Sequence, residues 1–139
     1  GSWKRFEQSL EMKKSIDPKK ASRYITKAEG FLEMANLALQ YSKYDSAVMN
    51  AVHSAISALD ALTTSFKGKR ASNEHTEVLS LIKGIFPSSE YEEIKKQFTS
   101  LISKKNASEY QPDLMDPKEA QDSVKWAERI LAKVKTKLK

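Results

Sequence analysis

The chain has 139 residues, of which 40% are hydrophobic and 30% are charged, the balance of one soluble globular domain. It contains no cysteine, which excludes disulfides, thiolate metal ligands and a thiol nucleophile. The formal net charge of +6 favours an anionic partner such as nucleic acid, although an ordinary lysine-rich surface has the same charge.

Residues 1–16 are set apart from the rest. The chain begins Gly1-Ser2 without a methionine, so we expect these two residues to be a remnant of cloning and the natural protein to extend further. Apolar residues at helical spacing follow, at Trp3, Phe6 and Leu10. We therefore predict a short N-terminal helix or linker within residues 1–16 and a helical bundle over residues 17–139.

Four longer helices are predicted from apolar residues that recur at helical spacing. Strand-type alternation is nearly absent, and there are only four glycines and four prolines. The first helix, about 17–42, has an apolar stripe that includes Tyr24 and Phe31. The second runs to about residue 66, the third from about 89 to 105, and the fourth from 116 toward the C-terminus.

Helix starts are marked by capping residues. Asp17-Pro18 begins the first helix and Asp45 is expected to cap the second. Two capping boxes are predicted, Ser89 with Glu92 and Asp116 with Glu119.

A shorter helix ending before Pro87 and a loop over residues 106–115 complete the expected elements. Most connections are short, so the prediction is an all-α, up-and-down bundle. No apolar run approaches the roughly 18 residues of a membrane span, and no signal peptide is recognisable. We expect a cytoplasmic protein that makes no membrane contact.

Arg70 and His75 stand five positions apart between two predicted helices. Histidine transfers protons near neutral pH, and arginine grips phosphate oxygens with two parallel hydrogen bonds. His75 is placed where the shorter helix begins, and either Ser72 or Asn73 can cap that helix. The pair indicates an acid–base group beside a phosphate-binding group. The alternative is that His75 is an ordinary surface residue of a first helical turn.

Four polar residues share one stripe of the second long helix, namely Asn50, His53, Ser57 and Asp60. In one interpretation they line a cleft beside Arg70, and Asp60 orients Arg70 or a histidine. In the other they form a buried polar network that fixes the helix register, since buried polar groups need partners. The pattern leaves both open.

Residues near the motif also suggest RNA contacts. Lys67 and Lys69 are placed to contact the RNA backbone, and otherwise belong to a solvated loop. Tyr110, in a predicted loop, is a candidate for stacking on a base. The two histidines lie on different helices without a recognisable carboxylate set, so no metal site is predicted, and no cofactor is expected.

The segment Arg70-Ala-Ser-Asn-Glu-His75 fits the Arg-x(4–6)-His motif of HEPN domains. The sequence resembles this family, in particular its small prokaryotic and archaeal members, from about residue 20 to 135. Other segments are similar too: 44–47, 50–53, 60–62, 106–110, 119–120 and 127–131. One position departs from the pattern, because Ala71 stands where active nucleases often have a polar residue, although Asn73 is close enough to assist.

The resemblance implies a homodimer in which two Arg–His motifs face each other across a cleft. Many relatives are metal-independent endoribonucleases, often toxins paired with a small nucleotidyltransferase antitoxin. Others are non-catalytic modules for dimerisation or for binding a protein, nucleotide or RNA. The first expectation is a HEPN ribonuclease with Arg70 and His75 as its catalytic residues, and the alternative is a binding module.

Overall fold

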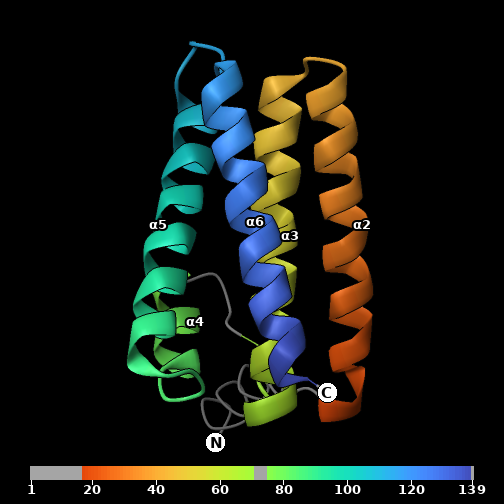
Figure 1. Ribbon diagram of the computed structural model, residues 1–139, viewed down its shortest axis with the longest axis vertical. Coiled ribbons are helices and arrows are strands. Elements are labelled where there is room, and N and C mark those ends of the chain that lie inside the picture. The colour runs from red at the N-terminus through yellow and green to blue at the C-terminus, as the bar shows by residue number, and fades with distance from the viewer. Residues whose placement is uncertain (1–16, 71–74, 139) are drawn as a thin grey trace, which may run out of the picture.

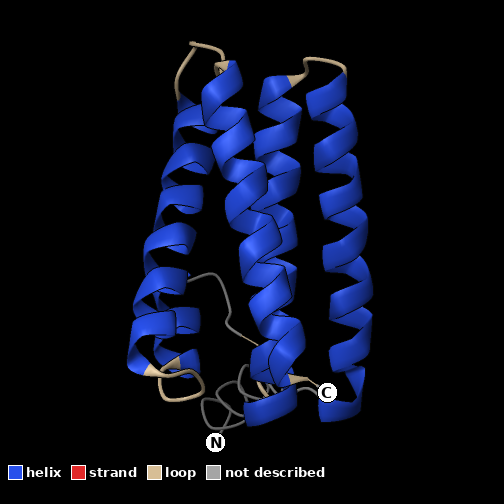
Figure 2. Cartoon of the chain, viewed as in Figure 1, coloured by secondary structure: helices blue, strands red, loops and turns tan. Residues whose placement is uncertain are grey.

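The computed structural model describes residues 17–70 and 75–138, with only the backbone of His75 and Thr76. The predicted N-terminal helix and the predicted caps Ser72 and Asn73 lie outside the described residues. Every regular element in the described part is a helix (Figure 2). These elements are η1 (Pro18–Lys20), α2 (Ala21–Gln40), α3 (Tyr44–Lys67), α4 (His75–Ile82), α5 (Ser88–Tyr110) and α6 (Pro117–Lys137).

The four long helices form an up-and-down bundle, which confirms the predicted fold class (Figure 1). Helix α3 lies behind α6, with α2 and α5 on the two sides. The α2–α3 and α5–α6 connections lie at one end of the bundle. The short helix α4 lies at the other end, beside the beginning of α5. Helices α3 and α4 are neighbours in space as well as in sequence.

Helix α3 is the centre of the bundle, since it packs against α2, α4, α5 and α6. Its alanines Ala47, Ala51, Ala55 and Ala58 are completely buried. Small side chains let neighbouring helices approach closely, and the larger core residues fill the remaining space. The Ser54 hydroxyl donates a buried 2.7 Å hydrogen bond to the carbonyl oxygen of Ala28. This bond fixes the register between α2 and α3.

Helix α5 differs from its prediction at both ends. The predicted capping box of Ser89 and Glu92 is wrong, because Pro87 occupies the cap position and Ser89 already lies within the helix. Proline pre-sets a backbone angle that suits the entry to a helix. At the other end, residues 106–110 are helical rather than a loop. The partly buried Ala107 packs against the core there and favours the extra turn.

The carboxylate of Asp45 does not cap α3 as expected. The helix begins at Tyr44, and Asp45 instead accepts hydrogen bonds from the Ser108 hydroxyl at 3.0 Å and the Met115 amide at 3.3 Å. Asp45 thereby ties the α5–α6 connection to the start of α3. The second predicted capping box is confirmed: the Asp116 carboxylate accepts from the Glu119 amide at 2.7 Å, and the Glu119 carboxylate accepts from the Asp116 amide.

Candidate functional site

Helix α3 ends at Gly68, whose backbone is left-handed with φ of 61°. A glycine adopts this conformation without steric strain, and its amide donates to the Thr64 carbonyl oxygen at 3.0 Å. The chain turns sharply here and leaves Lys67, Lys69 and Arg70 exposed to solvent. Three cationic side chains thus gather at one end of the bundle.

Asp60 lies on α3 near this turn and is only 9% exposed. Burial raises the pKa of its carboxyl to about 7, while the positive charges of Arg70 and Lys27 act in the opposite direction. Arg70 and Lys27 are therefore both close enough to act electrostatically on Asp60. We call Lys27, Asp60 and Arg70 the Asp60 cluster. It joins α2, α3 and the turn that follows α3.

The polar stripe of α3 divides between the surface and the interior. Ser57 and Asp60 are buried, whereas His53 is exposed. Asn50 is half-buried, and its side-chain amide donates to the Ser46 carbonyl oxygen at 2.9 Å within its own helix. His53 and Asp60 are seven residues apart, about 10 Å along the axis. The four residues therefore follow one another along the helix instead of meeting at one point.

Helix α4 begins at His75, the second residue of the Arg–His motif. The Tyr91 hydroxyl donates to the Leu79 carbonyl oxygen at 3.1 Å and so ties α4 to α5. Five residue steps separate Arg70 from His75, so their Cα atoms are at most about 18 Å apart. Because His75 lies in the first turn of α4, the helix dipole attracts anions to its surroundings. Asn73 lies outside the described residues.

Tyr110 lies far from the motif. It is the last residue of α5 and is 81% exposed. Figure 1 places the end of α5 at the opposite end of the bundle from the end of α3. The structure thus brings Lys67 and Lys69 next to Arg70 but does not bring Tyr110 there.

Two residues of α2 near the site were not among the predicted site residues. Lys27 acts on Asp60, and Phe31 contacts His53, with ring centroids 5.4 Å apart and planes inclined by 32°. Phe31 was assigned only to the apolar core stripe, and Lys27 resembled any exposed lysine. Only the register of α2 against α3 reveals their position.

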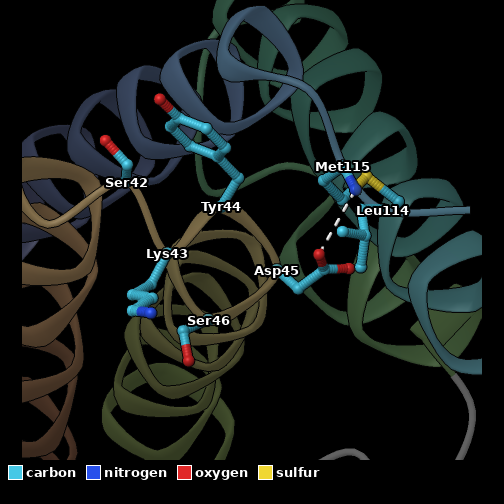
Figure 3. A pocket seen from close by; sticks show the side chains of 7 residues that line it. All are labelled: Ser42, Lys43, Tyr44, Asp45, Ser46, Leu114 and Met115. Atoms are coloured by element: carbon cyan, nitrogen blue, oxygen red, sulfur yellow. Dashed lines mark hydrogen bonds between the residues drawn. The ribbon is translucent and has the colours of Figure 1, made fainter.

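A separate pocket of about 340 Å³ lies at the other end of the bundle, by the α2–α3 connection (Figure 3). Asp45 lines it, and Figure 3 shows the carboxylate already bound to the Met115 amide. None of the predicted site residues lines this pocket.

Residues 17–70 and 75–138 contain no group of three or more His, Asp or Glu side chains that could hold a metal ion. No helix within the same residues is long and apolar enough to cross a membrane.

Comparison with known families matches the profile of the HEPN domain to residues 21–137, nearly the whole chain. The chain belongs to the HEPN domain family. This match confirms the family suggested by the Arg70–His75 motif. HEPN domains often act as ribonucleases or nucleotide-binding modules, and they commonly dimerise.

A solved structure shares the fold of this HEPN domain. It is the crystal structure of TT1696 from Thermus thermophilus, with a TM-score of 0.69 and 20% sequence identity. The alignment covers 85% of this chain and 98% of that chain. At this identity the likeness shows the fold alone. No curated protein matches the chain.

Proposed function

We propose that this HEPN domain is a metal-independent endoribonuclease that works as a homodimer, with Arg70 and His75 as catalytic residues. The observation that supports it best is the Asp60 cluster, which places charged groups near the end of α3, the helix against which α4 packs. A phosphate bound there would be close to an arginine and two exposed lysines, and α4 begins five residues after that arginine.

The proposed reaction is attack of a ribose 2′-oxygen on the adjacent phosphorus. His75 of one protomer removes the 2′-hydroxyl proton, and the bond between the 2′-oxygen and phosphorus forms. The bond from phosphorus to the 5′-oxygen breaks, and the partner's His75 protonates that oxygen. The products are a 2′,3′-cyclic phosphate and a 5′-hydroxyl. Arg70 stabilises the charge on the pentacoordinate phosphorane.

Surrounding residues have supporting roles in this proposal. Asp60 is a positioning residue, because its carboxylate attracts the Arg70 guanidinium when ionised. Lys67 and Lys69 bind flanking phosphates. Asn50, His53 and Asn73 remain predicted supporting residues, and pairing with a nucleotidyltransferase antitoxin remains a prediction from the family resemblance.

A second candidate is a HEPN module that binds its partner without cleaving it. Ala71 favours this function, since a polar residue often assists the chemistry at that position in active relatives. Both functions require the same folded domain. They differ in the effect of His75→Ala, because only the ribonuclease predicts a loss of cleavage with the dimer intact.

Incubation of a labelled single-stranded RNA panel with wild type and His75→Ala in EDTA tests the proposal. We expect the wild type to cleave and to leave 2′,3′-cyclic phosphate ends, and His75→Ala to lose at least about a hundredfold in rate. Both proteins are first shown to be folded and to have the same oligomeric state. No cleavage by a folded, dimeric wild type favours the binding module. Equal cleavage by both proteins contradicts the role of His75.

A further inference from the structure

A row of side chains continues from the Asp60 cluster along α2 and α3. The row is positioned by two contacts that fix the register of these antiparallel helices. The Ser54 hydroxyl binds the Ala28 carbonyl oxygen at 2.7 Å, and the ring of His53 lies 5.4 Å from that of Phe31. Each successive turn toward the start of α2 therefore lies beside the next turn toward the end of α3.

This register defines three successive levels, each about 5.4 Å from the next. Asp60 and Tyr24 form the level nearest to Arg70. Ser57 and Lys27 follow, and His53 with Phe31 forms the third level. We call the residues of these three levels the α2–α3 row. The sequence pattern did not group its α2 members with its α3 members, and only the packing of α2 on α3 aligns them.

The chemistry of the α2–α3 row alternates between charge and aromatic surface. Lys27 is exposed, and its ammonium lies 5.9 Å from the centre of the Tyr24 ring. The His53 ring is exposed, and the half-buried Phe31 supports it from one side. Asp60 is the acidic member, and it is buried with Lys27 and Arg70 offsetting its charge. The accessible part of the row therefore presents one cation and one aromatic platform.

We propose that the α2–α3 row is the path of the RNA strand beyond the cleaved bond, with Lys27 on a neighbouring phosphate and the His53–Phe31 platform under a base. The inference rests on the proposed function and defines its substrate. A base can stack on a protein ring only when it is free of a base-paired stack, so the substrate is single-stranded RNA. The accessible contacts of the row span on the order of two nucleotides, because the cation contacts one phosphate and the platform contacts one base.

Binding measurements in the His75→Ala background test this path, since the RNA then stays intact. Single-stranded RNA of about ten nucleotides, carrying one 2-aminopurine, reports affinity by anisotropy and stacking by fluorescence quenching. The variants are Lys27→Ala, His53→Ala and Phe31→Leu, the last of which keeps an apolar side chain but removes the ring. Lys125→Ala removes another exposed lysine, on α6, and is the matched control.

We expect Lys27→Ala to remove one phosphate contact. The slope of the logarithm of the binding constant against the logarithm of the salt concentration then becomes shallower by about 0.7. His53→Ala and Phe31→Leu are each expected to weaken binding about tenfold and to reduce 2-aminopurine quenching at one position of the strand. Lys125→Ala is expected to leave both readouts unchanged.

Three outcomes overturn the path. In the first, all three variants bind RNA with the affinity of the parent protein. This result rejects the α2–α3 row as the RNA path but leaves the proposed ribonuclease function in place. Another is the absence of RNA binding by the parent protein, which rejects the row and, when the wild type also fails to cleave, the proposed function with it. The third is a loss of affinity in Lys125→Ala equal to that in Lys27→Ala, which contradicts a specific path.

Discussion

At the scale of single residues, Asp60 combines burial with two positively charged neighbours. A carboxyl that is 9% exposed loses most of its hydration, and this loss favours the neutral form. Arg70 and Lys27 favour the charged form, but burial is the larger effect and the pKa rises from 3.8 to about 7. Near neutral pH the charge of Asp60 is therefore sensitive to its neighbours.

The raised pKa of Asp60 predicts how stability changes with pH. Because the folded state binds the proton more tightly than the unfolded state, the contribution of Asp60 is complete below about pH 4 and is lost as the pH rises through about 7. The shift corresponds to at most about 4 kcal/mol. We expect Asp60→Asn to be more stable than wild type above pH 7 and to lack this dependence.

Urea unfolding of the two proteins between pH 4 and 8 measures this difference. The matched control is Asp113→Asn, a substitution in the exposed α5–α6 connection that should leave the shape of the pH curve unchanged. Parallel curves for wild type and Asp60→Asn would show that the Asp60 pKa is close to that of the unfolded chain.

At the scale of elements, local sequence predicted helices better than it predicted their ends. The Asp116–Glu119 box lies directly before its helix and formed as predicted. The Ser89–Glu92 box did not form, because the cap of the helix is Pro87, two residues before the predicted cap. Asp45 also matched a capping residue, but hydrogen bonds to Ser108 and Met115 engage its carboxylate. Such long-range partners cannot be read from local sequence.

The same limit applies to the candidate site. Arg70 and His75 could be singled out because one six-residue segment contains both, and Asp60 because it shares a helical stripe with His53. Lys27 could not, because its importance depends on the side-by-side register of two helices. Tyr110 was assigned to the site by residue type, and the direction of α5 places it at the other end of the bundle.

The capping box that formed and the one that did not predict effects of different size for similar substitutions. Asp116→Ala removes the acceptor of the Glu119 amide and is expected to lower the free energy of unfolding by about 1 kcal/mol. Ser89→Ala changes an exposed residue that caps nothing, so its effect is expected to stay within about 0.5 kcal/mol. Thermal and urea unfolding compare the two variants directly. A Ser89→Ala cost as large as that of Asp116→Ala would restore the capping box that we rejected.

At the scale of the whole molecule, the proposed mechanism needs two copies because each chain supplies one His75. A heterodimer of wild type and His75→Ala, purified through two different affinity tags, then lacks either the base or the acid. We expect its cleavage rate to be far below half that of the wild-type dimer, by at least about tenfold. Independent sites would instead retain half of the activity. A wild-type homodimer with the same two tags is the control.

The buried alanines of α3 have a consequence for how this protein tolerates change. Ala47, Ala51, Ala55 and Ala58 are completely buried in α3, the helix against which α2 and α6 pack, and their small size lets neighbouring helices approach closely. Replacing one of them with a larger side chain lowers the free energy of unfolding by about 1 to 3 kcal/mol and shifts the backbone. Such a shift would separate Lys27 from Asp60. Residues without any chemistry of their own therefore hold the charged and aromatic residues of α2 and α3 in alignment, and a substitution among them would change that surface from inside the core.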